Sequence, residues 1–189
     1  MMRLVMLAYD GFTDVDLFLP WDLFNRVHDP DYVGYTKPWS VRICADTPQV
    51  TSNTGIAITP HGGLGELAQA DAVFIVSGPG SRAKLRDPDF MRQLELDPRR
   101  QVIGAIDSGV LFLARLGLLD GLSATTYPGV FAELEAMGVK TEHRPLVVHG
   151  QIATAGGCLA TQDLAGWMVS RLLGREIADS MLGMIARVE

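Results

Sequence analysis

Residues 101–114 read QVIGAIDSGVLFLA, and this stretch decides the fold. It begins as an apolar run of strand length and passes, through Asp107-Ser108-Gly109, into an apolar helical pattern. A strand without polar alternation is typical of a sheet that is covered on both faces. A strand, a sharp turn and a helix in this order form a nucleophile elbow, whose turn residue is held strained at the carboxyl edge of the sheet. The turn residue here is Asp107.

Outward from this stretch, apolar runs of strand length alternate with helical patterns. This alternation predicts an α/β fold, a three-layer sandwich with a mostly parallel central sheet. We expect strands at Leu4–Tyr9, Trp39–Ala45, Asp71–Val76, Gln101–Ile106 and Ser123–Tyr127. We expect helices at Leu17–His28, Asp87–Leu96, Val110–Leu118, Gly129–Met137, Leu159–Leu173 and Arg175–Val188, with C-terminal breaks at Gly121, Gly138 and Gly174.

Two β-rich segments interrupt this alternation. Residues 50–59 and 139–154 are broken by asparagine, glycine and proline, which predicts antiparallel β-hairpins appended to the parallel core. The segment 29–38 is a polar, proline-bearing loop that serves as a connector or covers a pocket.

Length and composition indicate one domain and limit the partners. With 189 residues, 48% hydrophobic and 20% charged, the chain can bury one core, and we expect a single domain over residues 1–189. A formal net charge of -6 without a basic run argues against a nucleic-acid partner. The N-terminal apolar run meets charge at Asp10, too early for a signal peptide or a membrane span, so we expect no membrane partner.

Cysteine and histidine placement gives no metal or disulfide signature. Cys44 and Cys158 lack Cys-x-x-Cys spacing, and the four histidines, His28, His61, His143 and His149, are scattered. We therefore predict no metal site and a cytoplasmic protein, with Cys44 in the core and Cys158 as a small buried residue rather than a displaced nucleophile.

Asp107 has two interpretations from the local sequence. Aspartate is a preferred N-cap residue, so Asp107 could simply cap the helix that follows. At an elbow it would instead be an anion beside unsatisfied backbone amides, which also stabilise developing oxyanions.

Further blocks along the chain point to a known family. They are YDGFTDVDLFLPWDLF at 9–24, VSGPG at 76–80, LGLLDG at 116–121 with ATTY at 124–127, and TAGGCLATQDLA at 154–165. Together with the elbow at 103–109, they resemble the ThiJ/PfpI superfamily, a class I glutamine amidotransferase-like group that includes the isonitrile hydratases. The resemblance implies a flavodoxin-like sandwich, a homodimer and no cofactor, and the LGLLDG block lies nearer the isonitrile hydratase and regulator branch.

The chain departs from that family at the elbow. Enzymes of the family carry cysteine where this chain has Asp107, and thiol chemistry cannot be transferred to a carboxylate. The histidine that often follows the next strand is replaced by Tyr127, which donates a hydrogen bond or packs.

Four residues form the predicted catalytic site. Asp16 matches the family's acidic residue beside the nucleophile, so it should face Asp107, raise one carboxyl pKa and share a proton with it. By the same resemblance, the backbone amides of Ser108 and Gly78 form the oxyanion hole.

Two functions follow from this site. The first is an isonitrile-hydratase-like hydratase or hydrolase of a small carbon–nitrogen or carbonyl substrate, with Asp107 as elbow carboxylate and Asp16 as its acid/base partner. The second is a catalytically inactive domain that binds or senses a small-molecule ligand, related to the N-terminal domains of transcriptional regulators. We expect no DNA-binding helix-turn-helix domain in this chain. A void beside Asp107 would favour the enzyme, whereas a site filled by Tyr127 would favour the sensor.

Overall fold

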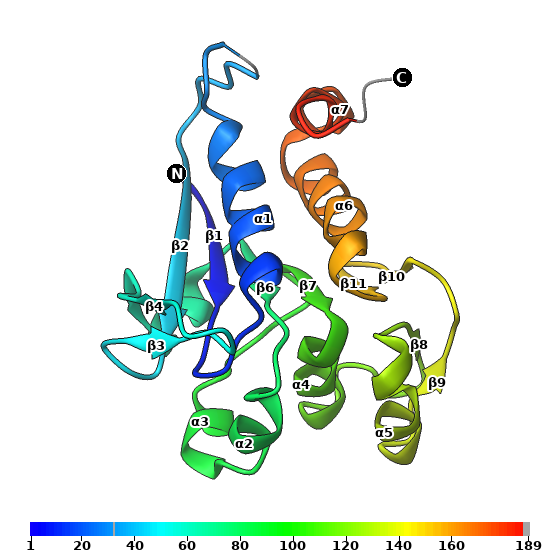
Figure 1. The fold of residues 1–189 in the computed structure, drawn as a ribbon. Helices are drawn as coiled ribbons and strands as arrows, with labels where there is room; N and C mark the ends of the chain where they lie inside the picture. Colours follow the sequence, from blue (N-terminus) through cyan, green and yellow to red (C-terminus); the bar gives the residue numbers. More distant parts are fainter. Residues whose placement is uncertain (32, 187–189) are drawn as a thin grey trace.

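The computed structural model describes residues 1–31 and 33–186 and has a mostly parallel sheet at its centre (Figure 1). Seven strands lie in the order β10-β11-β7-β6-β1-β2-β5, and only the β10–β11 pair is antiparallel. Their bounds are β1 Met2–Leu7, β2 Trp39–Ala45, β5 Gly62–Gly63, β6 Ala72–Ile75, β7 Val102–Ile106, β10 Leu146–His149 and β11 Ile152–Ala155. The predicted flavodoxin-like α/β fold is confirmed.

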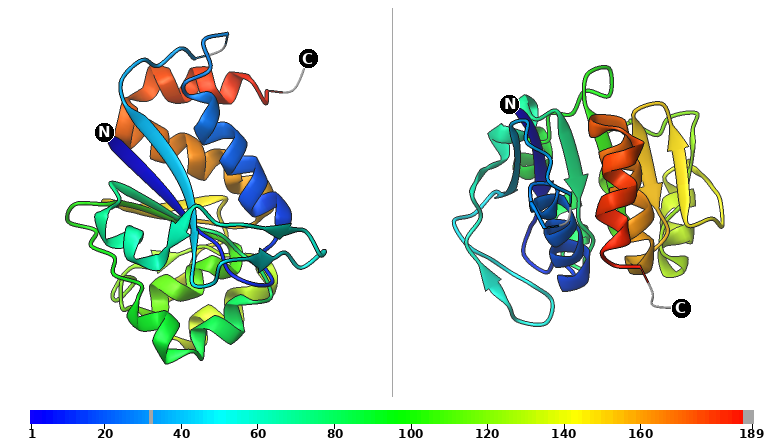
Figure 2. Two further views of the ribbon diagram at one scale, coloured as in Figure 1. Left: turned by 90° about the vertical axis from the view of Figure 1, so that its left-hand side faces the viewer. Right: turned by 90° about the horizontal axis from the view of Figure 1, so that it is seen from above.

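Helices flank this sheet in two groups. Figures 1 and 2 show α1, α6 and α7 packed together, while α2 to α5 gather near the carboxyl ends of the strands. The helices are α1 Asp14–Arg26, α2 Ser81–Leu85, α3 Pro88–Arg92, α4 Val110–Arg115, α5 Phe131–Ala136, α6 Thr161–Leu173 and α7 Arg175–Gly183. Short 3-10 turns span Leu64–Gln69, Asp107–Gly109, Pro128–Val130 and Cys158–Ala160.

The apolar runs are buried, as a sheet covered on both faces requires. All residues of β6, β7 and β11 are buried, and none of these strands alternates between apolar and polar side chains. Because β1, β6, β7 and β11 run in the same direction, the segments that follow them meet at one edge of the sheet.

One predicted strand is wrong. Ser123–Tyr127 supplies only the two-residue β8 (Ser123–Ala124), which pairs with β9 (Lys140–Thr141) in a separate small sheet. The reason is polar pairing: the Thr125 amide donates to Thr154 Oγ1 (3.0 Å), and Thr126 Oγ1 donates to the Asp107 carbonyl (2.7 Å). These bonds hold the segment beside the strand ends instead of within the central sheet.

β11 pairs with β7 in the central sheet, although the sequence predicts that this segment forms an appended hairpin. β10 and β11 do form an antiparallel hairpin, but that hairpin is part of the central sheet. The other expected hairpin is correct: β3 (Val50–Thr51) and β4 (Ala57–Ile58) pair antiparallel outside the core.

Most helix boundaries differ from the predicted ones by a few residues, and the following differences are the most informative. The five-residue α2 was missed because it is too short to show helical periodicity. The helix predicted at Arg175–Val188 ends at Gly183, and the end of that prediction, residues 187–188, lies outside the described residues. Gly121 does not end a helix, because α4 stops at Arg115, whereas Gly174 is the C-terminal cap of α6, as expected. Among the described helices, none is long and apolar enough to span a membrane.

Gly109 gives a test of the close packing at the sheet edge. A Cβ at this position would lie 2.6 Å from the Val76 carbonyl oxygen and 2.8 Å from that of Ile75, both rigid backbone atoms. We predict that Gly109→Ala lowers the free energy of unfolding by about 1–3 kcal/mol, measured by urea denaturation. Gly183→Ala is the control, because a Cβ there meets no atom within 4 Å. Equal stability of the two variants would contradict the prediction.

Candidate active site at the carboxyl edge of the sheet

Asp107 occupies the sharp turn between β7 and α4. Its φ of 48° makes it the one non-glycine residue with a positive φ within residues 1–31 and 33–186. Such a left-handed backbone is strained for a residue with a side chain and is what an elbow requires. The capping alternative does not describe this geometry, since the residue at the N-cap of the turn is Ile106 and that of α4 is Gly109.

Asp16 comes to the same place from the first turns of α1. It is fully buried, and Ser77 Oγ donates a hydrogen bond to its Oδ2. Its other oxygen, Oδ1, is buried and has no hydrogen-bond partner within the described part of the chain. The structure therefore brings the two predicted carboxylates together and leaves one of their oxygens unsatisfied.

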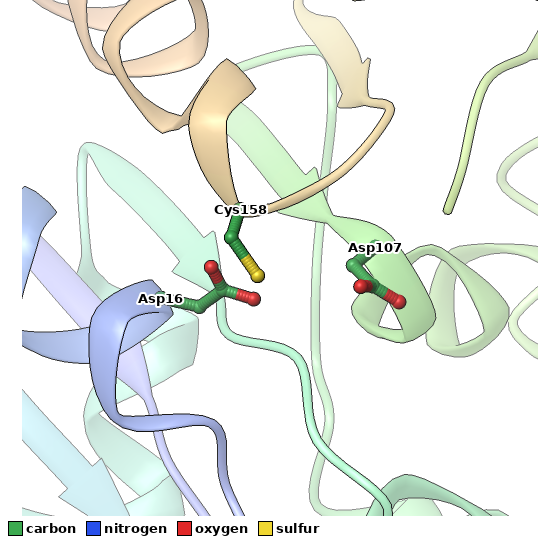
Figure 3. A group of neighbouring side chains, drawn as sticks. All are labelled: Asp16, Asp107 and Cys158. Atoms are coloured by element: carbon green, nitrogen blue, oxygen red, sulfur yellow. The ribbon is translucent and has the colours of Figure 1, made fainter. Parts of the chain in front are cut away.

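Cys158 is a third member of this group. The sequence predicts only a small buried residue here, whereas the side chain is partly exposed and lies beside the two carboxylates. Ligand atoms of Asp16, Asp107 and Cys158 all lie within 4.8 Å of one another, and Figure 3 shows the side chains of Asp16 and Cys158 pointing toward each other beside Asp107. The thiol stands at the start of the turn that follows β11. The signal that could have found it is the order of strands, because the segments after two adjacent parallel strands lie close together.

Burial raises the pKa of all three groups, and the charge of Asp16 raises the pKa of the other two further. Burial, followed by the charge of Asp16, raises the pKa of Asp107 to about 6, against the smaller opposing effects of the Ser108 amide and Arg82. Burial also raises the pKa of Asp16, although the hydroxyl of Ser77 and, to a smaller extent, the neighbouring thiol of Cys158 work against it. Burial and the charge of Asp16 raise the pKa of the Cys158 thiol to about 12. The site thus gathers proton-binding groups with little compensating positive charge.

The backbone amide of Gly78 is already engaged. It donates to Ser108 Oγ (3.0 Å), and the same hydroxyl lies 3.2 Å from the Gly78 carbonyl, to which it can donate. A substrate oxygen that uses this amide must displace the Ser108 hydroxyl. A side chain at position 78 is excluded, because a Cβ would lie 2.1 Å from the Gly11 carbonyl.

A cavity of about 260 Å³ opens in front of Asp107. A larger, more apolar cavity of about 580 Å³ adjoins it, with Tyr127 in the wall of both and Cys158 in the wall of the larger one. The Tyr127 side chain is 51% exposed and does not fill the space beside Asp107. The residues around the smaller cavity are Thr13, Ser77, Gly78, Pro79, Arg82, Asp107, Ser108, Tyr127, Gly129 and Val130.

The histidines lie in other parts of the structure. His61 stacks on Trp21, with ring centroids 5.1 Å apart, and its Nδ1 accepts a hydrogen bond from the Ile43 amide on β2 (3.0 Å). His28 stacks on Tyr35, His143 packs against Phe131, and His149 pairs with Ser123. None of the four lines either cavity.

The hydroxyl of Ser108 gives a stability prediction. We expect Ser108→Ala to lower the free energy of unfolding by about 1–3 kcal/mol, because it leaves the buried Gly78 amide without its acceptor. Ser40→Ala is the matched control, since the Ser40 hydroxyl is buried without a hydrogen-bond partner in the described chain. Urea denaturation measures both, and a Ser108→Ala loss no larger than that of Ser40→Ala would refute the expectation.

The chain is similar in sequence to an enzyme and to part of a transcriptional regulator. An isonitrile hydratase from Pseudomonas putida is 26% identical over 180 residues, which make up 94% of this chain and 75% of that protein. The HTH-type transcriptional regulator CdhR from Pseudomonas aeruginosa is 28% identical over 168 residues, or 84% of this chain. This chain spans less than half of the regulator, 46% of its length.

Fold and sequence profile agree on the family. The crystal structure of a ThiJ/PfpI family protein from Pseudomonas syringae superposes with a TM-score of 0.84 at 26% identity, covering 97% of this chain and 74% of that one. Residues 2–170 match the sequence profile of the DJ-1/PfpI family. With the strand order, the elbow and the blocks around it in place, the chain belongs to the DJ-1/PfpI family.

Proposed function

We propose that this protein adds water to, or hydrolyses, a small substrate with a carbon–nitrogen or carbonyl group, using Asp107 and Asp16. One observation carries the proposal: an elbow carboxylate faces a cavity and lies beside a fully buried carboxylate that has an unsatisfied oxygen. Such pairs perform general acid/base catalysis, because one carboxyl holds a proton while the other accepts one. The similarity to an isonitrile hydratase supports a hydration reaction.

The roles of the two carboxyls follow from their positions. Asp107 lines the cavity, so it exchanges protons with the substrate or the attacking water. Asp16 lies behind it, fully buried and held by Ser77, and exchanges a proton with Asp107. For an isonitrile, a proton goes to the terminal carbon, the water oxygen bonds to the same carbon, and loss of a proton from that oxygen to the carboxylate leaves an N-substituted formimidic acid. Transfer of its hydroxyl proton to the nitrogen then gives the N-substituted formamide.

The backbone amides polarise the substrate in this proposal. The Ser108 amide lies at the N-terminal turn beside Asp107, where a developing negative charge is stabilised. The Gly78 amide joins it only when a substrate oxygen replaces the Ser108 hydroxyl. The cavity of about 260 Å³ lies below the usual range for drug-sized ligands, which suits a substrate of a few heavy atoms.

The second candidate is a domain that binds a small ligand without turning it over. Two observations favour it: the elbow has no thiol, and the Gly78 amide is occupied by the chain's own Ser108. The similarity to part of a transcriptional regulator is consistent with a sensing role. The homodimer implied by the resemblance and the cytoplasmic location predicted from the cysteines remain predictions for either candidate.

Turnover of a small panel of isonitriles, amides, esters and α-oxoaldehydes tests the enzyme. We predict that Asp107→Asn and Asp16→Asn each lower kcat/KM by at least about 100-fold, because each substitution removes a proton-binding group. Asp120→Asn, a change of an exposed carboxylate, is the control and should retain full activity. Activity that survives both site substitutions would disprove the carboxylate mechanism.

Stability of Asp107 variants tests the strain and charge at the elbow. We expect Asp107→Asn to raise the free energy of unfolding at pH 7 by about 1–2 kcal/mol, since it removes a buried charge beside Asp16 and asparagine tolerates positive φ. Asp107→Ala also removes the charge but disfavours a φ of 48°, so it should be less stable than Asp107→Asn. Thermal unfolding measures both. If no substrate turns over and Asp107→Asn is stabilised, the ligand-binding candidate is favoured; an unstabilised Asp107→Asn contradicts the charge argument.

A further inference from the structure

The group formed by Asp16, Asp107 and Cys158 has the donor atoms of a metal site. Each side chain offers one ligand atom, and these atoms lie within 4.8 Å of one another. A tetrahedral zinc ion, with bonds of 2.0–2.3 Å, holds its ligand atoms about 3.3–3.8 Å apart. Side-chain rotations that move the ligand atoms by roughly 1 Å therefore bring all three within bonding distance of one zinc ion.

An unsatisfied atom points to a missing ligand at this position. Asp16 is 0% exposed, yet its Oδ1 has no hydrogen-bond partner in the described chain. Figure 3 shows the Asp16 carboxylate directed at the thiol of Cys158 and toward Asp107, which is the space that a shared ion would occupy. A buried carboxylate oxygen without a partner is costly, and coordination of a cation satisfies it.

The charge balance of the site favours a cation as well. Two carboxyl groups and a thiol share this space. Arg82 lines the same cavity as Asp107, but its guanidinium is paired with Glu133 at 2.8 Å. A divalent ion supplies positive charge where the chain itself supplies little.

We propose that Asp16, Asp107 and Cys158 bind a divalent zinc ion. The donor set selects the metal, because zinc accepts thiolate together with carboxylate, whereas magnesium and calcium require oxygen ligands. Binding displaces the thiol proton of Cys158, which a coordinating cation removes even from a weakly acidic thiol. The sequence predicts no metal site, because its cysteines and histidines lack the spacing of metal ligands. The tertiary structure changes this expectation by bringing Asp16, Asp107 and Cys158 together.

Zinc binding goes beyond the proposed function and does not depend on it. A carboxylate oxygen that is bound to zinc cannot carry a proton, so zinc and the acid/base use of Asp107 exclude one another. Zinc should therefore inhibit any carboxylate-dependent turnover at one equivalent. Because binding is measured without substrate, failure of one proposal leaves the other intact.

Cobalt is the spectroscopic probe for this site. The reduced, metal-free full chain is titrated with Co²⁺, and we expect a near-ultraviolet thiolate-to-cobalt absorption band that saturates at one equivalent and disappears when Zn²⁺ is added. Cys158→Ser should abolish the band, and Asp16→Asn and Asp107→Asn should each weaken Co²⁺ binding by more than tenfold. Cys44→Ser is the matched control: Cys44 is the other cysteine, buried on β2, and its loss should leave the band unchanged.

A second measurement needs no variant, which covers the case in which a variant fails to fold. Zinc should slow alkylation of Cys158 in the wild-type chain by more than tenfold, as followed by peptide mass spectrometry, and should not change that of Cys44. A band that persists in Cys158→Ser, or unchanged alkylation of Cys158, would mean adventitious binding only and would overturn the proposal. The absence of any band at millimolar Co²⁺ would overturn it too.

Discussion

The left-handed backbone of Asp107 is the constraint on which the rest of the site depends. An aspartate keeps a φ of 48° only where its surroundings hold both sides of the turn. On one side β7 is locked between β6 and β11, and on the other Gly109 brings the next helix against the carbonyls at the end of β6. The packing on both sides of the turn therefore fixes the backbone of Asp107, and its carboxylate points away from the edge of the sheet.

The electrostatics of the site follow from this position. The elbow places Asp107 beside Asp16, and the neighbouring strand end adds the thiol of Cys158. Three acidic groups in a poorly hydrated space cannot all lose their protons without a counter-charge. The negative charge of such a group can be balanced in two ways, by a proton that the carboxyls share or by a bound cation. The proposed function uses the first way and the proposed zinc site uses the second.

Membership of the DJ-1/PfpI family limits the possible functions but does not decide between catalysis and ligand binding. The chain is similar in sequence to an isonitrile hydratase and to part of a transcriptional regulator, both about a quarter identical to it over most of its length. What decides between turnover and ligand binding is the chemistry at the elbow, where this chain has a carboxylate and a thiol that comes from the adjacent strand. The open cavity in front of Asp107 shows that Tyr127 has not closed this site.

The sequence by itself determined the local features of this protein. The elbow at 101–114, most of the parallel strands and the meeting of Asp16 with Asp107 could be predicted, because they rest on short patterns and on a resemblance that keeps its order along the chain. Strand order was decided by the tertiary structure. Ser123–Tyr127 lies outside the central sheet and β11 pairs with β7, which places Cys158 next to the carboxylates. The pairing of β6 with β7 places Ser108 against Gly78. Those contacts join residues distant in sequence, and such pairings depend on how the whole sheet buries its faces, which no short segment encodes.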